Sequence, residues 1–171
     1  RQMCIRDRNV TEGNIIVNTT DKGTVRLILN NASISNTTTA PIKVLDAKKV
    51  ILTLADNTTN TITDSSRLST EEDYSAAIYS KEDLIINGNG TLNVNAGYRN
   101  GIKSTDDCII VSGTLNITST EDGIIGKDLC GIVAGDININ AGSDGVKSTY
   151  DTDTTKGNVI IEGGNITIKA S

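Results

Sequence analysis

Histidine, phenylalanine and tryptophan do not occur in the 171 residues, which contain only four Tyr and one Pro. The absence of His excludes imidazole catalysis, His-ligated zinc and a histidine-based pH switch. Without Phe and Trp, the core has to be filled by Ile, Val and Leu, and the β-branched residues among them favour strands over helices. The same absence removes the largest apolar ring faces on which sugars commonly stack.

A basic patch is missing as well, because 16 Lys and Arg stand against 21 Asp and Glu, a formal net charge of -5. We therefore expect no nucleic-acid partner, since nucleic-acid binding needs a cluster of positive charge. No apolar run reaches the length of about 18 residues that a membrane-spanning helix needs, so we expect no membrane span. Asn, Thr, Asp and Gly are abundant instead, and they are typical of short strands joined by turns.

A sequence element repeats along the second half of the chain. It begins at Gly101, Gly123 and Gly145, 22 residues apart both times, and a related copy begins 24 residues earlier at Ala77. Each copy is accompanied by apolar pairs with a spacing of two residues, the period of a strand with one buried face. These pairs are Leu84/Ile86 with Leu92/Val94, Cys108/Ile110 with Leu115/Ile117, Cys130/Ile132 with Ile137/Ile139, and Val159/Ile161 with Ile166/Ile168.

A repeat of this length with three short strands cannot bury its apolar face alone, whereas stacked repeats can. The sequence therefore predicts an all-β fold, a single-stranded right-handed parallel β-helix with coils of about 22 residues. Leucine-rich repeats have a similar period, but their Leu/Asn consensus and their helical stretch are missing. Two inward ladders are predicted, Ile78, Ile102, Ile124 and Val146 in one and Leu92, Leu115, Ile137 and Ile166 in the other.

The ends of the chain set the expected domain boundaries. Residues 1–8 contain the only Met and a cluster of Arg, and they do not match the pattern that follows. We interpret them as a non-native tail and assign residues 9–171 to one β-helix domain that is truncated at both ends. An acidic run, Glu71-Glu72-Asp73, is predicted to lie in a surface loop of this domain.

Aspartate residues recur about one repeat apart and are candidates for binding a metal. Stacked carboxylates repel one another by about 1 to 4 kcal/mol per pair, so they are either solvated or neutralised by a cation. Ca2+ prefers clustered carboxylates and turn carbonyls, and the alternative is that these Asp residues form only the local hydrogen bonds of turns. The predicted ladders are Asp122 with Asp144, Glu82 with Asp106 and Asp128, and Asp83 with Asp107 and Asp151. The predicted calcium ligands are Asp106, Asp107, Asp122, Asp128, Asp144, Asp151 and Asp153.

One row of side chains is expected to point outward from the strand that opens each repeat. It contains Tyr79, Lys103 and Lys147, and we predict these three as ligand-binding residues. The glycines that open the repeats lie on the other side of the inward residue and are expected to form a smooth outward floor. Lys side chains above such a floor suit an extended anionic polymer. In the alternative interpretation, Gly supplies a bend and Lys offsets nearby Asp.

Two further ladders are predicted to be structural. Cys108 and Cys130 fall at equivalent positions, where the strand spacing permits a disulfide. We expect a pair of inert buried thiols instead, because both point into the core, where free Cys packs as a small hydrophobic residue. Asn93, Asn116 and Asn138 are predicted to stack as an outward ladder.

Several motifs occur in an order that resembles a known family over residues 25–171. They are Ala76-Ala77-Ile78-Tyr79-Ser80-Lys81, Asn87-Gly88-Asn89-Gly90-Thr91-Leu92, Asp122-Gly123-Ile124 and Asp144-Gly145-Val146-Lys147-Ser148. With these motifs the chain resembles bacterial carbohydrate-binding domain-containing proteins. The resemblance implies a fold similar to that of pectate lyases, calcium binding, binding of polygalacturonate and cellulose, and a secreted or cell-surface location. One departure is Ile125-Gly126, which replaces the Lys-Ser step of neighbouring coils.

Three functions are compatible with these residues. The first is non-catalytic extracellular binding of an acidic plant polysaccharide such as pectin through Ca2+ and Lys, or binding of cellulose. The second is a pectate-lyase-like enzyme, in which calcium acidifies the proton beside a uronate carboxylate and Lys103 or Lys147 removes it with a lowered pKa. The third is a structural adhesin stalk. We expect binding without catalysis, because repeated shallow rows of Lys and Asp suit a polymer better than a single reacting atom.

Overall fold

The structure is a computed structural model that describes residues 1–65 and 74–171, so the acidic run at 71–73 lies outside the described residues. The strands form three sheets, which we call A, B and C. Sheet A contains β1 (Gln2–Arg6), β4 (Thr24–Asn30), β7 (Lys49–Leu54), β10 (Asp83–Gly88), β13 (Asp107–Ile110), β16 (Leu129–Ile132) and β19 (Asn158–Ile161). Sheet B contains β2 (Asn9–Thr11), β5 (Ser33–Asn36), β8 (Thr59–Asp64), β11 (Thr91–Ala96), β14 (Thr114–Ser119), β17 (Asp136–Ala141) and β20 (Asn165–Ala170). Sheet C contains β3 (Ile15–Asn18), β6 (Ile42–Asp46), β9 (Ala76–Ser80), β12 (Asn100–Ser104), β15 (Ile124–Gly126) and β18 (Val146–Lys147).

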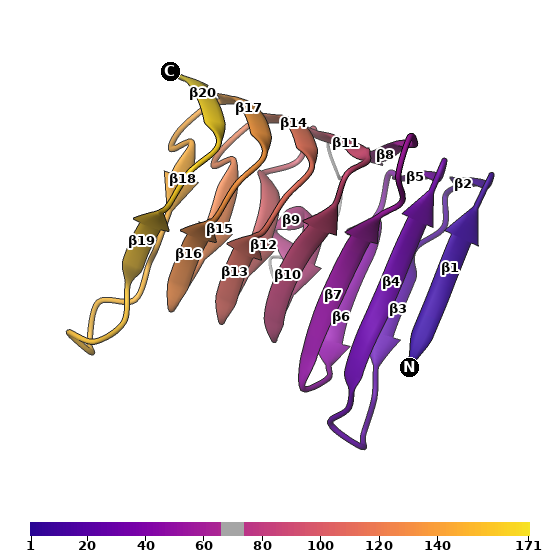
Figure 1. Cartoon of the computed structure of the whole chain (residues 1–171), viewed down its shortest axis with the longest axis horizontal. Helices are drawn as coiled ribbons and strands as arrows, with labels where there is room; N and C mark the ends of the chain where they lie inside the picture. Colours follow the sequence, from indigo (N-terminus) through magenta and orange to yellow (C-terminus); the bar gives the residue numbers. More distant parts are fainter. Residues whose placement is uncertain (66–73) are drawn as a thin grey trace.

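The chain winds through the three sheets in the order A, B, C, and equivalent strands of successive turns pair in parallel. Figure 1 shows sheet A in front, sheet C behind it and sheet B along the upper edge, with the turns stacked along the long axis. The predicted all-β fold with parallel coils is confirmed: a parallel β-helix in which the described segments contain no α-helix. None of these segments is a helix that could cross a lipid bilayer.

The strand registers match the predicted inward ladders. Ile102 pairs with Ile78 and Ile124, and Leu115 pairs with Leu92 and Ile137. Alternate side chains of a strand point to opposite faces, so one set of aliphatic residues from all three sheets fills a single core. The predicted ladder of thiols is also present, because Cys108 pairs with Cys130 and both are buried and free.

Residues 1–8 are part of the solenoid. The strand β1 pairs with β4 from Gln2↔Arg26 to Arg6↔Asn30, and Ile5 packs against the core. Met3 and Ile5 occupy the positions that Leu27 and Leu29 occupy one turn later. That residues 1–8 are non-native stays a prediction. Their exclusion from the β-helix was wrong, because their alternating side chains continue the pattern of the next coil.

An insertion interrupts the period in the last turn, between β18 and β19. Asp107 pairs with Leu129, and Leu129 pairs with Asn158. The predicted ladder of Asp83, Asp107 and Asp151 is therefore wrong in its last member, which lies exposed in the insertion. The register fails there because the inserted residues leave the coil before β19 begins.

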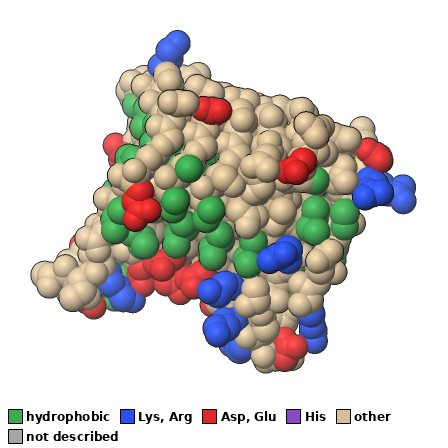
Figure 2. All heavy atoms as spheres, viewed as in Figure 1, with side chains coloured by type: hydrophobic (Ala, Val, Ile, Leu, Met, Phe, Trp, Pro, Cys, Tyr) green, Lys and Arg blue, Asp and Glu red, His purple; other side chains and the backbone are tan. Residues whose placement is uncertain are grey.

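Sheet A has an aliphatic outer face, which the sequence analysis did not predict. Ile51, Ile85, Ile109 and Ile160 point outward at equivalent positions, and Gly131 interrupts their column. Figure 2 shows hydrophobic side chains in a band across this face and acidic side chains gathered along its lower edge. That lower edge is where each turn passes from sheet C into sheet A.

Candidate functional site

The turns from sheet C into sheet A carry a group of half-buried carboxylates in three successive coils. Buried Ser hydroxyls shape these turns. The Ser80 hydroxyl donates to the carbonyl oxygen of Glu82 at 2.6 Å, and the Ser104 hydroxyl donates to the same carbonyl at 2.9 Å. The backbone N–H of Asp106 in turn donates to Ser104 Oγ at 3.0 Å. One coil is thereby tied to the next, which brings together the residues that we call the acidic corner: Glu82, Asp83, Asp106, Asp107 and Asp128.

Three members of the acidic corner converge. One carboxylate oxygen from each of Asp83, Asp106 and Asp107 lies within 4.8 Å of the other two. Burial, followed by the charges of Asp83 and Asp128, raises the pKa of the Asp106 carboxyl to about 6. Burial and the same two charges also raise the pKa of Asp107, although the positive charge of Lys156 opposes this. Full ionisation of this cluster therefore costs free energy unless a cation offsets the repulsion.

Lysine side chains bracket the corner at both ends. Lys22 bonds the Asp46 carboxylate and lies 3.7 Å from Glu82, while Lys156 bonds the Asp128 carboxylate. The Lys156 ammonium also lies 5.0 Å from the centre of the Tyr150 ring. Within residues 1–65 and 74–171, no ion pair involves Asp83, Asp106 or Asp107. The negative charge at the centre of the corner therefore has no direct ion-pair partner among the described residues.

The donor set at this centre suits calcium. Ca2+ takes six to eight oxygen ligands in flexible geometry, and carboxylates bind it through one or both oxygens. Three convergent carboxylates at a turn supply such oxygens, with room for further ligands from outside the protein. Zinc would prefer His and Cys ligands, and the chain contains no His. The residues present therefore fit calcium better than zinc.

Asp122 and Asp144, two predicted calcium ligands, already have partners. Lys147 Nζ lies 3.3 Å from Asp122 Oδ2 and 2.8 Å from Asp144 Oδ2. The backbone N–H of Asp144 donates to Asp122 Oδ1 at 2.9 Å, and the backbone N–H of Asp122 donates to Asn100 Oδ1 at 3.0 Å. This is the turn-bonding role that the sequence analysis left open, and Lys147 supplies the positive charge. Calcium binding at this pair stays a prediction.

The remaining predicted calcium ligands lie apart from the convergent cluster. Asp128 belongs to the acidic corner, but its carboxylate is bonded to Lys156. In the insertion, Asp153 accepts hydrogen bonds from the backbone N–H and the hydroxyl of Thr155, which lower its pKa. Asp151 is exposed beside it. In contrast, Asp83 was assigned to a ladder but not to the metal, and the structure brings it into the cluster.

The predicted ligand-binding row on sheet C has the expected register, because Lys103 pairs with Tyr79 and with Ile125, and Ile125 pairs with Lys147. Tyr79 is only 7% exposed and packs edge-on against Tyr74, with ring centres 5.4 Å apart. Lys103 Nζ donates to Ser75 Oγ at 3.1 Å. Burial, followed by the charge of Arg99, lowers the pKa of Lys103. Lys103 is therefore the chemically unusual member of the row.

The expected outward floor of glycine is wrong. A Cβ on Gly101 would lie 2.5 Å from Ile117 Cγ2, and a Cβ on Gly123 would lie 2.6 Å from Ile139 Cγ2. At both glycines the position that a Cβ would take faces the core, because the chain bends from sheet B into sheet C here. Only Gly leaves room for the Ile side chains of sheet B, so the glycines are needed for packing.

Comparison with known proteins gives one family. A family model described as carbohydrate-binding domain-containing protein matches residues 8–171. A protein of the same description from Acetivibrio thermocellus is 37% identical over 110 residues, which cover 62% of this chain and 38% of that protein. The chain thus spans well under half the length of this curated relative.

A solved structure has the same fold. It is described as the polysaccharide lyase-like protein from C. thermocellum, gadolinium derivative. The two structures superpose with a TM-score of 0.91 at 34% sequence identity, over 100% of this chain and 73% of the other.

Proposed function

Because the chain belongs to the family of carbohydrate-binding domain-containing proteins, we propose that it binds an acidic polysaccharide through calcium held at the acidic corner. The observation that carries this proposal is the convergence of Asp83, Asp106 and Asp107 without a basic partner among the described residues. Bound calcium would neutralise these carboxylates and leave coordination positions for carboxylates of the polymer. A uronic acid polymer offers such a carboxylate on every sugar.

Two further observations support a cation at this place. Burial raises the pKa of Asp106, and the charges of neighbouring carboxylates raise it further; a divalent cation would relieve this second contribution. The solved relative is described as a gadolinium derivative. Gadolinium, like calcium, is a hard cation that prefers oxygen ligands, so a relative that takes it up is consistent with a carboxylate site in this fold.

The outward row of sheet C supplies the second part of the proposed site. It lies beside the acidic corner, since β12 ends at Ser104 and Asp106 follows two residues later. The ammonium of Lys103 is half-buried and hydrogen-bonded to a hydroxyl, so its charge is available to a carboxylate of the polymer. Lys147 contributes less, because two carboxylates already neutralise it. Tyr79 contributes little surface, because it is only 7% exposed.

Retention on polygalacturonate tests this proposal. The wild-type domain is expected to be retained in millimolar calcium and released by a chelator. The double variant Asp106→Asn/Asp107→Asn is expected to lose affinity by on the order of tenfold or more. Asp56→Asn is the matched control, because Asp56 is an exposed turn residue outside the corner.

Three results would contradict the proposal. Equal retention of the wild type and the double variant would leave the acidic corner without a binding role. Loss of retention only with Asp122→Asn and Asp144→Asn would move the site to that pair. Absence of retention on any acidic polymer would favour the structural stalk.

One observation favours a second candidate, a polysaccharide lyase: the lowered pKa of Lys103. A neutral Lys103 amine could take the proton from the carbon beside a uronate carboxylate. The glycosidic bond on the next carbon would then break, and its oxygen would leave with a proton, so that the uronate becomes unsaturated. The charges that act on Lys103 come from Arg99, Asp122, Glu121 and Lys147, not from the acidic corner. Lys103 also recurs as Lys147 two coils later, as a row along a polymer would, so binding is the better supported function.

Ultraviolet absorbance separates binding from cleavage. We expect no unsaturated product when the domain is incubated with polygalacturonate and calcium. Product that accumulates with the wild type and disappears with Lys103→Ala would make the protein an enzyme.

The proposed ligand also bears on location. Plant polysaccharides are too large to enter a bacterial cell intact, so we propose that the domain works as a secreted or cell-surface module. Protection of the protein from protease added to whole cells would contradict a surface location.

A further inference from the structure

Sheet B has an outer face of a different chemistry from the rest of the surface. On the five strands from β8 to β20, inward residues that are mostly aliphatic alternate with outward residues that are mostly Thr and Asn. The registers place the outward side chains in three straight columns across the strands. The members of this polar face are Thr59, Thr61, Thr63, Thr91, Asn93, Asn95, Thr114, Asn116, Thr118, Asp136, Asn138, Asn140, Asn165, Thr167 and Lys169.

The polar face is almost free of charge. Charged residues make up 22% of the chain and concentrate on protein surfaces in general. On this face the only two are Asp136 and Lys169, both on the last two strands. Long flexible side chains and aromatic rings are absent from β8, β11 and β14. A flat face of this kind does not attract a polyanion, and its natural partner is an uncharged surface rich in hydrogen-bonding groups.

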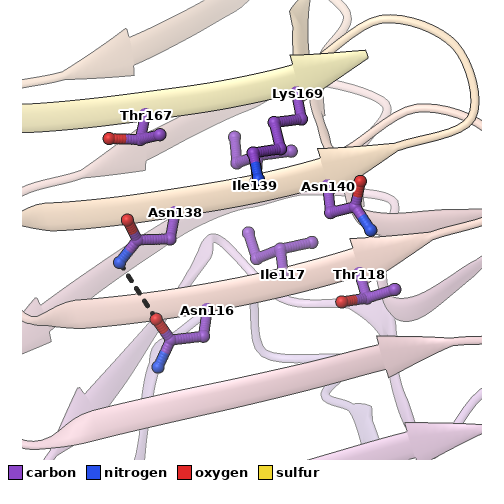
Figure 3. A pocket seen from close by; sticks show the side chains of 8 residues that line it. All are labelled: Asn116, Ile117, Thr118, Asn138, Ile139, Asn140, Thr167 and Lys169. Atoms are coloured by element: carbon purple, nitrogen blue, oxygen red, sulfur yellow. Dashed lines mark hydrogen bonds between the residues drawn. The ribbon is translucent and has the colours of Figure 1, made fainter. Parts of the chain in front are cut away.

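The middle column of the face is held in place by its own hydrogen bonds. Asn116 Nδ2 donates to Asn93 Oδ1 at 2.9 Å, and Asn138 Nδ2 donates to Asn116 Oδ1 at 3.1 Å. Figure 3 shows the second of these bonds and the common orientation of the amides. A primary amide has two N–H donors and two acceptor lone pairs. The ladder uses one donor and one lone pair of Asn116, so this amide is fixed while half of its capacity remains for a ligand.

The next column leaves more capacity unused. Among the described residues, the side chains of Thr118 and Asn140 make no hydrogen bond to another protein group. A shallow groove of about 280 Å³ runs between the two columns, and Figure 3 shows Asn116 and Asn138 on one side of it with Thr118 and Asn140 on the other. Thr and Asn lose less rotamer freedom on binding than Lys or Glu. Ligand binding to prearranged short side chains therefore has a low entropic cost.

We propose that the polar face of sheet B binds an uncharged, hydroxyl-rich glycan without calcium. The hydroxyl groups of such a glycan both donate and accept hydrogen bonds, as do the Asn amides and Thr hydroxyls of the face. The columns run along the solenoid with one residue per strand, about every 4.8 Å. A β-1,4-linked glycan advances by a comparable distance per sugar, so successive sugars meet successive coils. The inference shares only its ligand class with the proposed function, because the face and the binding chemistry are separate from the acidic corner.

Depletion from solution by insoluble uncharged β-1,4-glucan, xylan and mannan, all in chelator, tests this inference. The wild type is expected to bind at least one of the three. Thr118→Arg and Asn140→Arg each place a long charged side chain over the groove, and each is expected to lower the affinity on the order of tenfold or more. Thr53→Arg makes the same exchange on an outward position of sheet A and is expected to bind like the wild type.

The outcomes distinguish this inference from the proposed function. Both groove variants are expected to retain calcium-dependent binding to polygalacturonate, which also shows that they are folded. Absence of wild-type binding to all three uncharged glycans would overturn the inference, whatever the result with polygalacturonate. Equal binding by the wild type and both groove variants would overturn it too, since another face would then carry the interaction.

Discussion

The acidic corner and the polar face of sheet B are both made by stacking similar side chains on successive coils, with opposite energetic results. At the polar face, Asn116 donates to Asn93 and accepts from Asn138, because an amide carries both donors and acceptors. At the corner, Asp83 and Asp107 occupy equivalent positions beside Asp106, and ionised carboxylates can only accept. Stacked amides therefore hydrogen-bond one another, whereas stacked ionised carboxylates repel one another unless a cation lies between them. One core can thus carry a face whose stacked side chains bond one another and a corner whose stacked side chains repel one another.

The largest expected difference between the two regions is their response to calcium. Free calcium at about 100 times its dissociation constant is expected to stabilise the wild type by about 2.7 kcal/mol, because only the folded chain assembles the corner. Asp106→Asn/Asp107→Asn should abolish this response and raise the melting temperature in chelator, since repulsion is removed. Thermal melts with and without calcium measure both effects. A double variant that still gains stability from calcium would contradict the assignment.

The second largest expected effect is on how the free energy of unfolding depends on pH, to which the acidic corner contributes. In chelator, Asp106 has a folded-state pKa of about 6, above its ordinary value of 3.8. The folded state then binds more protons than the unfolded state between these values, so Asp106 makes stability fall as pH rises through this window. Calcium should remove the fall, because its ligands must be deprotonated. Melts at pH values from 4 to 7 on the wild type and Asp106→Asn check this, and identical profiles for the two would contradict it.

An exchange of residue types between the two regions sharpens the comparison. Asn116→Asp removes the amide donor to Asn93 and should destabilise the fold by about 1 kcal/mol, the usual value of one such hydrogen bond. The reverse exchange, Asp107→Asn, should stabilise the fold in chelator. Denaturant unfolding measures both free energies. The same sign for both exchanges would show that stacking chemistry does not distinguish the regions.

The smallest expected effect concerns Lys156, which bonds Asp128 at the end of the corner. Lys156→Gln removes a positive charge near the cluster and should tighten calcium binding by at most about fivefold, because an exposed ion pair contributes less than about 1 kcal/mol. Lys169→Gln is the control, because Lys169 is exposed on sheet B, away from the corner, and has no ion pair among the described residues. Isothermal titration calorimetry measures both affinities. Weaker binding by Lys156→Gln than by the control would place Lys156 in another role.

Most of the core could be predicted from the sequence, because a period near 22 residues and a spacing of two within strands dictate which side chains stack. The ladder from Ile78 to Val146 follows from these two periods alone. The same argument failed for Asp151, since the insertion before β19 breaks the period. It also failed for Gly101, where the bend between sheets turns the glycine toward Ile117.

The site could be predicted only in part, because it depends on which carboxylates find a basic partner. Asp122 and Asp106 are equally periodic in the sequence, but Lys147 reaches Asp122 from the next coil. The convergence of Asp83 with Asp106 and Asp107 was not predicted, although its position in a predicted ladder beside Asp107 was a usable signal. The polar face could be predicted from Thr and Asn at alternate positions. A ladder of Asn does not by itself indicate a ligand, because its members hydrogen-bond one another. The ligand is indicated by Thr118 and Asn140, which line the groove without hydrogen bonds to other described protein groups.

The most direct test of the central claim is the position of a bound cation. Crystals of the domain soaked with a lanthanide as a calcium substitute would give an anomalous difference map. The account predicts a peak coordinated by Asp83, Asp106 and Asp107, and its loss when calcium is added in large excess. A peak between Asp122 and Asp144 instead, or no peak at the acidic corner, would contradict it.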